Sequence, residues 1–237
     1  MRNLIARGQE LLDDAQNPHC GRAFAAVSYS AMASLNRLLG TFGTVRRFVA
    51  SEAGRLDGDR PLRVLDLGAG DCEVAEQVAR WATGRSLRLD FTCLDANPHA
   101  IRMARRRLAG SPELKISPCC ERVEDHLPEA PYDCAVGSLF FHHFSTPQML
   151  GLLERLRGMV RRSVLITDLR RSSAAFMGFL ALGPALHRGV WRDGLMSIRR
   201  GFRAPELQRT LRHLPQARVQ CRDERLFRVV GRVHYQR

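Results

Sequence analysis

Residues Arg63–Glu73 read Arg-Val-Leu-Asp-Leu-Gly-Ala-Gly-Asp-Cys-Glu, and this stretch decides the fold. Val64–Leu67 is the short, mostly apolar run that is typical of a buried parallel strand. Gly68 and Gly70 follow it directly, and glycine lets the backbone turn tightly and approach a ligand. A helix is expected to begin near Cys72. A strand, a glycine turn and a helix in this order predict the ligand-binding unit of an α/β protein.

Acidic residues in this unit argue against a dinucleotide, which is the main alternative ligand for such a turn. In the G-x-G-x-x-G fingerprint, a third glycine lets the helix pack close to the pyrophosphate. Glu73 stands at that position, and its negative charge would repel phosphates. Asp66 and Asp71 add further negative charge. The turn therefore favours a ligand that carries an ammonium and a sulfonium but no phosphate, and S-adenosylmethionine is such a ligand.

The second predicted strand, 87–95, ends in an acid. In dinucleotide folds an acid at the end of the second strand accepts hydrogen bonds from the ribose hydroxyls. Asp95 is therefore the predicted ribose ligand.

The rest of the chain alternates helices and strands, which predicts an α/β fold with a doubly wound parallel sheet. Two helices, Asn3–Ala15 and Arg22–Ala53, are expected to cap the cofactor cleft, with Gly40 and Gly43 bending or splitting the second. After the first strand we expect helices at 72–82, 98–109 and 146–157, strands at 114–120, 132–139 and 163–169, and a final strand pair at 218–223 and 226–234.

Four motifs in order resemble the class I S-adenosylmethionine-dependent methyltransferases, specifically the small ubiquinone-methyltransferase-like group. The resemblance covers roughly Leu62–Leu169. Its motifs are Leu65–Gly70 as the first motif, Leu94–Asn97 as the second, Glu121–Leu127 as the segment that meets adenine, and Tyr132–Val136 with Phe140–Phe144 as the fourth strand and its turn.

The resemblance implies a seven-stranded, mostly parallel Rossmann-like sheet with an N-terminal helical cap and a helical lid between strands five and six. It implies S-adenosylmethionine as the cofactor. The acid after the third strand is open between Glu124 and Asp125, with Glu124 preferred, and Cys72 stands where the family often has another glycine. The implied cofactor contacts are Asp66, Gly68, Ala69, Gly70, Asp95, Ala96, Glu124, Asp125 and Leu139.

Length and composition fit one domain. The chain has 237 residues, 45% of them hydrophobic, enough for a large core without disulfides or metal. We expect a cap at 1–60, a cofactor-binding core at 61–169, an acceptor lid at 170–216 and the final strand pair at 217–237. No signal peptide or bilayer-spanning run is evident, so we expect a soluble, cytoplasmic protein.

The seven cysteines form no C-x-x-C pair and no zinc-like spacing with histidine. They predict reduced thiols and no metal site. The neighbours Cys119 and Cys120, at the end of the third strand, are expected to be buried structural thiols.

A net charge of +13 raises the question of nucleic acid. Of the 37 basic residues only Lys115 is lysine, and the arginines are spread along the whole chain without an RNA-binding signature. We therefore do not expect a nucleic acid substrate. An RNA methyltransferase remains the alternative, and it predicts strongly salt-dependent RNA binding.

The predicted lid is apolar. Ala174–Leu186, with Trp191, Met196 and Phe202 beyond it, would supply the wall of a small-molecule pocket, although core packing or a dimer contact would explain it equally well. The arginines of the lid would suit an anionic membrane surface; they are Arg188, Arg192, Arg199, Arg200 and Arg203.

Two short segments, Asp168–Ser172 and Asp193–Ser197, resemble methyltransferases that are encoded beside bacterial type III polyketide synthases. That resemblance implies a phenolic or quinone-like lipid acceptor.

Methyl transfer from a sulfonium is an in-line displacement, so the protein mainly aligns and desolvates the partners. A phenolic acceptor must still lose its proton, and histidine is suited to accept it near neutral pH. His143 is the predicted base or acceptor-orienting group and His142 the second candidate, with Asp168 a further acceptor-side candidate. Alternatively, either histidine shapes its turn by bonding to the backbone.

These observations predict an O-methyltransferase that acts on a small apolar or phenolic acceptor. Carbon methylation in quinone-like biosynthesis is the nearest chemical variant of this function. A cofactor-binding domain without catalysis would bind S-adenosylmethionine but would methylate no acceptor.

Overall fold

The structure is a computed structural model that describes residues 27–29, 31, 34, 36–37, 40–181, 183, 186–225 and 227–236. The predicted helix Asn3–Ala15 lies outside these residues, as do Cys20 and much of the predicted helix 22–53.

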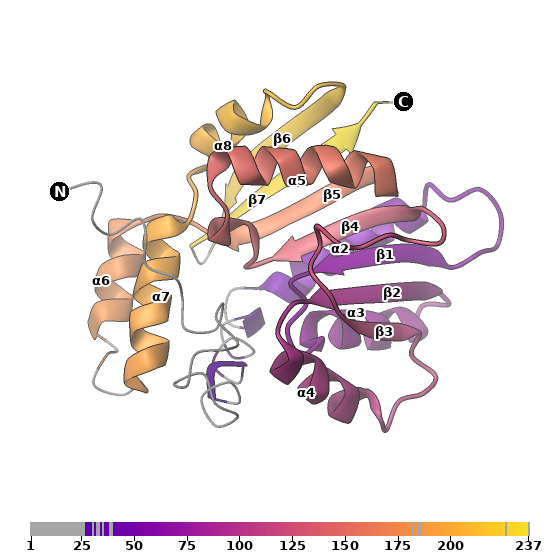
Figure 1. The fold of residues 1–237 in the computed structure, drawn as a ribbon, viewed down its shortest axis with the longest axis horizontal. Helices are drawn as coiled ribbons and strands as arrows, with labels where there is room; N and C mark the ends of the chain where they lie inside the picture. The colour runs from indigo at the N-terminus through magenta and orange to yellow at the C-terminus, as the bar shows by residue number, and fades with distance from the viewer. Residues whose placement is uncertain are drawn as a thin grey trace.

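A seven-stranded sheet forms the centre of the molecule (Figure 1). Its strands are β1 (Leu62–Leu67), β2 (Leu89–Asp95), β3 (Ile116–Cys120), β4 (Tyr132–Ser138), β5 (Val160–Leu169), β6 (Ala217–Glu224) and β7 (Arg228–Tyr235). The helices are α2 (Thr41–Ala53), α3 (Glu73–Thr83), α4 (Pro98–Leu108), α5 (Thr146–Met159), α6 (Ser173–Ala181), α7 (Arg188–Arg200) and α8 (Ala204–Leu211), with a 3-10 helix η2 at Phe141–His143.

The strand order is β3-β2-β1-β4-β5-β7-β6, and β7 is antiparallel to both of its neighbours. This confirms the predicted doubly wound, mostly parallel sheet. From β1 the chain adds β2 and β3 toward one edge of the sheet, and from β4 it adds β5 toward the other edge. The loops after β1 and β4 therefore run in opposite directions, which makes this the switch point of the sheet. In open α/β sheets ligands bind at such a switch point, outside the carboxyl ends of the strands.

Local signals explain where the helices begin. Asn97 caps α4 by accepting a hydrogen bond from the His99 amide at 2.9 Å, and Pro98 occupies the first turn. Ser145 opens α5 with a capping box, in which the Gln148 side chain accepts a hydrogen bond from the Ser145 amide at 2.9 Å.

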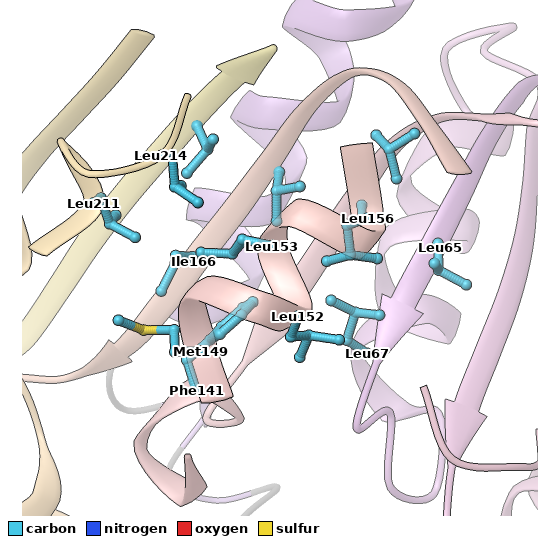
Figure 2. Close-up of a cluster of buried hydrophobic side chains, with 14 of the residues drawn as sticks. Leu65, Leu67, Phe141, Met149, Leu152, Leu153, Leu156, Ile166, Leu211 and Leu214 are labelled. Carbon is cyan, nitrogen blue, oxygen red and sulfur yellow. The ribbon is translucent and has the colours of Figure 1, made fainter. Parts of the chain in front are cut away.

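Helices cover both faces of the sheet. Helices α5 and α8 pack on one face, and α2, α3 and α4 pack on the other. In Figure 1, α5 lies in front of the sheet while α2 and α3 lie behind it. Figure 2 shows the first of these cores, in which side chains of α5 point toward the strands; they are Met149, Leu152, Leu153 and Leu156.

Truncation of this core should be costly. Leu153 is 0% exposed, and we expect Leu153→Ala to lower the free energy of unfolding by about 2–5 kcal/mol, through lost burial and the cavity left behind. Urea denaturation measures the change. The matched control is Leu127→Ala, because Leu127 is 81% exposed and its truncation removes little buried surface. Equal effects of the two substitutions would contradict this description of the core.

The predicted split of the helix 22–53 occurs at Gly40, which adopts a left-handed conformation at the N-cap of α2, whereas Gly43 stays inside α2. Two further details differ from the sequence-based expectations. Strand β5 begins three residues before the predicted Ser163, directly after α5. Cys119 is partly exposed and Cys120 is exposed, so the expectation that both are buried is wrong; β3 is an edge strand.

Between β5 and β6 the chain forms α6, α7 and α8. Helices α6 and α7 pack together as an α6–α7 hairpin that stands beyond the carboxyl ends of the parallel strands (Figure 1). Among the residues described, no helix has both the length and the apolar character to cross a bilayer.

Candidate active site

A cleft of about 420 Å³ opens at the carboxyl ends of β1, β2, β3 and β4. Most of the predicted site residues line it; they are Asp66, Gly68, Ala69, Gly70, Asp95, Ala96, Glu124, Leu139 and His143. Asp125 and His142 do not. The switch point of the sheet therefore brings together residues that lie far apart in the sequence.

The glycine turn after β1 has no room for side chains. Gly68 and Gly70 have φ values of +62° and +57°, in the left-handed region that favours glycine. A Cβ atom on Gly68 would lie 2.3 Å from the ring of Phe140, and one on Gly70 would lie 3.0 Å from the ring of Tyr29. The turn is thus held between two aromatic rings at the floor of the cleft.

Asp66 is the most perturbed acid of the site. It is 2% exposed, and its Oδ2 atom has no hydrogen-bond partner in the described part of the chain. Burial, and then the nearby charge of Asp95, raises the pKa of Asp66 to about 7. A buried carboxyl group with a pKa perturbed in this way, lying in a cleft, marks a candidate functional site.

Asp95 is fixed by backbone donors on both sides. Its Oδ2 atom accepts a hydrogen bond from the Gly70 amide at 2.8 Å, and its Oδ1 atom accepts one from the Asn97 amide at 2.8 Å. The carboxylate therefore ties the glycine turn to the loop after β2.

The other two acids of the first motif are compensated by arginines. Glu73 is 3% exposed and pairs with Arg37 at 3.1 Å, and Asp71 pairs with Arg107. The sequence predicts that both acids contribute negative charge around the turn. Of the acids in the first motif, ion pairing leaves Asp66 as the one without an arginine partner in the described part of the chain.

Glu124 and Asp125 differ in position. Glu124 lines the cleft and lies 3.5 Å from Arg122, whereas the side chain of Asp125 is 69% exposed and does not line the cleft. Their placement agrees with the preference for Glu124.

Glu121 is a cleft residue that sequence reasoning missed. It directly follows β3, and its Oε2 atom lies 2.8 Å from His126 Nδ1. The Nε2 atom of His126 lies 2.9 Å from the Tyr132 hydroxyl, so a buried histidine holds the acid in place. Its position at a strand end, the same signal that identifies Asp95, would have pointed to it.

The loop after β4 forms the opposite wall. Leu139 has a φ of +54°, which is uncommon for a side chain of this kind, and its amide donates to the Thr167 carbonyl at 2.9 Å. The loop then turns into η2, and His143, Phe140 and Phe144 all line the cleft.

His142 points away from the cleft and into the protein. It is 6% exposed, and its Nδ1 atom lies 2.7 Å from Asp168 Oδ1, while its amide donates to Asp168 Oδ2 at 3.1 Å. Burial raises the pKa of Asp168, but His142 and the Leu169 amide outweigh burial and hold that pKa below its usual range. The His142 and His143 rings are 4.1 Å apart. His142 and Asp168 therefore anchor the turn that carries His143.

The predicted lid contributes little to the cleft. Arg200 of α7 is its only described residue in the lining, and the apolar wall comes from Val74, Leu94, Val123, Phe140 and Phe144 instead.

Comparisons with known proteins agree with this geometry. Residues 64–163 match the family described as a methyltransferase domain. No curated protein matches the sequence.

Three solved methyltransferases illustrate the structural similarity. The plantazolicin methyltransferase BpumL, in complex with SAH, is 13% identical, with a TM-score of 0.70 over 94% of this chain and 92% of that one. Magnesium protoporphyrin IX methyltransferase (ChlM) from Synechocystis PCC 6803, with bound SAM, is 11% identical, with a TM-score of 0.57 over 84% and 79% of the two chains. The methyltransferase SibL, in its apo form, is 22% identical, with a TM-score of 0.55 over 75% and 51%.

At these identities the similarity establishes the fold. The family match adds that residues 64–163 form a methyltransferase domain, which confirms the resemblance of the motifs to class I S-adenosylmethionine-dependent methyltransferases.

Proposed function

We propose that the protein transfers the methyl group of S-adenosylmethionine to a hydroxyl group of a small apolar or phenolic acceptor. The observation that carries this proposal is the position of His143, which lines the same cleft as the glycine turn, Asp95 and two phenylalanine side chains.

The residues present fit the cofactor. Asp66 would receive the ammonium, because its buried Oδ2 atom has no donor in the described part of the chain. Asp95 would accept the ribose hydroxyls, and Glu121 or Glu124 would meet the adenine end. Bound there, the cofactor supplies an activated methyl group. These carboxylates suit a cation and would oppose the phosphates of a dinucleotide.

His143 would take the proton of the acceptor hydroxyl. It lies on a turn that the buried pair of His142 and Asp168 anchors, so its backbone is fixed relative to β4 and β5. Phe140 and Phe144 provide an apolar surface beside it. An apolar wall with one proton acceptor suits a phenol better than a strongly polar substrate.

Ion pairing weakens the case for RNA as the substrate. Several arginines that contribute to the net charge are engaged by acids of the protein; they are Arg37, Arg60, Arg107, Arg162, Arg171 and Arg232. Each of them faces a carboxylate of the protein, which makes it less available to a phosphate group. Structural neighbours are named for plantazolicin and for magnesium protoporphyrin IX, neither of which is a nucleic acid.

Calorimetric titration tests the cofactor assignment, and a turnover screen tests the acceptor. The protein should bind S-adenosylmethionine and its demethylated product, and it should not bind a nicotinamide dinucleotide. Phenolic acceptors should then be methylated at rates that RNA does not match. Binding of the dinucleotide alone would refute the cofactor assignment, and turnover on RNA alone would refute the acceptor class.

Asp95→Ala should weaken cofactor binding by about 1–3 kcal/mol, the range for losing hydrogen bonds in a buried site. The substitution also removes the acceptor for the Gly70 and Asn97 amides, so Asp95→Asn, which retains one carbonyl oxygen, should have a smaller effect. Asp59→Ala is the control, because Asp59 has 98% of its side chain exposed. Calorimetry measures all three, and unchanged affinity in Asp95→Ala would refute the ribose assignment.

A further inference from the structure

Helix α6 has the composition of a buried helix and the exposure of a surface helix. Its sequence, Ser-Ala-Ala-Phe-Met-Gly-Phe-Leu-Ala, contains no charged residue, yet none of its residues is buried. Met177 is 60% exposed and Leu180 is 37% exposed. Contiguous apolar patches on the surface of soluble proteins often mark sites of interaction, so an apolar helix with this exposure is a candidate for one.

The two faces of α6 have separate roles. Its inner face packs on α7, since the Phe179 ring lies against Gly194 and the Arg199 guanidinium lies 4.5 Å from the centre of the Phe176 ring. Met177 and Leu180 are one helical turn apart, and they form the outer face with Ala174 and Ala181. Packing within the hairpin therefore does not account for the outer face.

The charge around this face is all of one sign. In the sequence from 170 to 203 the only acid is Asp193, and its side chain is 6% exposed. Helix α7 exposes Arg188, Arg192 and Arg199, which follow one another at helical spacing. Within the described part of the chain these three arginines form no ion pair, in contrast to the paired arginines of the core.

We propose that the outer face of α6, with the arginines of α7, docks on an anionic lipid bilayer. Apolar side chains would enter the acyl boundary while the guanidinium groups bind the lipid headgroups, which is the arrangement of interfacial helices. Arg200 of the same α7 lines the cleft, so a docked hairpin places the cleft close to the membrane. The inference concerns a surface outside the cleft and does not depend on the acceptor.

Sedimentation with vesicles tests the proposal, using neutral phosphatidylcholine vesicles and vesicles with about a third of anionic phosphatidylglycerol. The protein should sediment only with the anionic vesicles. Arg188→Gln/Arg192→Gln should weaken binding about 30-fold, because each basic side chain near such a surface contributes about 1 kcal/mol. Met177→Glu/Leu180→Glu should weaken it at least about tenfold, because burial of such side chains is lost.

Matched substitutions on α4 provide the control. Arg105 and Arg106 are exposed, and Arg105→Gln/Arg106→Gln removes the same charge from another part of the surface.

No binding of the wild-type protein to anionic vesicles would overturn the proposal. An equal loss in the α4 variant, or full binding by Met177→Glu/Leu180→Glu, would also overturn it and leave only non-specific electrostatic adsorption. A dimer in size-exclusion chromatography that Met177→Glu/Leu180→Glu dissociates, without vesicle binding, would make the face a self-association surface instead. Thermal unfolding verifies that each variant is folded.

Discussion

Replacing Asp66 by asparagine is expected to stabilise the cofactor-free protein and, at the same time, to weaken its binding of S-adenosylmethionine. The pKa of this carboxyl group is about 7 in the folded protein, whereas the pKa of an aspartate in an unfolded chain is about 3.9. The folded state therefore holds the proton more tightly than the unfolded state does.

The sign of the pH dependence follows from this difference. Between about pH 4 and pH 7 the unfolded chain releases the proton and the folded protein retains it, so stability falls as the pH rises through this window. Above pH 7 the folded protein bears the full cost of burying the ionised Asp66 carboxylate. The difference in pKa between the two states corresponds to about 4 kcal/mol of stability. Because asparagine still buries a polar amide, we expect Asp66→Asn to gain about 1–4 kcal/mol at pH 8 and less at pH 5. Urea denaturation at the two pH values measures the gain.

Cofactor binding should change in the opposite direction. Loss of a carboxylate that receives a charged donor weakens binding by about 1.5–3 kcal/mol, or roughly 10- to 150-fold. The wild-type affinity should rise between pH 6 and pH 8 as Asp66 ionises, and the affinity of the variant should change less. Asp59→Asn, an exposed control, should alter neither stability nor affinity. If Asp66→Asn were less stable than the wild type, the carboxyl group would have a partner that the geometry does not show.

The fold was predictable because its signals are local. Val64–Leu67 and the other apolar runs are each long enough for one strand. Gly68 and Gly70 mark the turn between the first strand and the helix that follows it. Strand boundaries agree within about three residues, since the apolar runs end where polar residues begin. Helix α2 begins directly after Gly40, one of the two glycines at which the sequence predicts a bend or a split, because Gly40 adopts a left-handed conformation there.

Parts of the site could not be predicted because they depend on contacts between distant residues. Nothing near Glu73 or Asp71 in the sequence shows that Arg37 and Arg107 will neutralise them. Likewise, His142 and His143 are indistinguishable as neighbours in the sequence, and only the position of Asp168 on β5 separates an anchored histidine from one that faces the cleft.

His143 is the residue on which the proposed chemistry depends. His143→Gln should lower kcat by about 10²- to 10⁴-fold, the usual contribution of a positioned general base, with little change in cofactor affinity. It should also remove the rise of the rate with pH that a histidine base imposes near neutrality. Steady-state methylation rates with a phenolic acceptor, measured across about pH 5.5–9, would test both effects. His213→Gln is the matched control, because His213 is exposed and outside the cleft.

Substitution of the neighbouring residue, His142, distinguishes a catalytic role from a structural one. His142→Gln should act chiefly on stability, by about 1.5–3 kcal/mol, because it removes the imidazole hydrogen bond to the buried Asp168 while the two backbone donors remain. Its turnover should retain the wild-type dependence on pH wherever the protein is folded, since His143 is still present. If instead His143→Gln keeps its rate and its pH profile while His142→Gln loses both, the buried histidine is the base, and the acceptor must reach the interior of the turn. If neither substitution alters the pH profile, neither of these histidines takes the proton, which would be expected of a carbon acceptor or of a group that is already ionised.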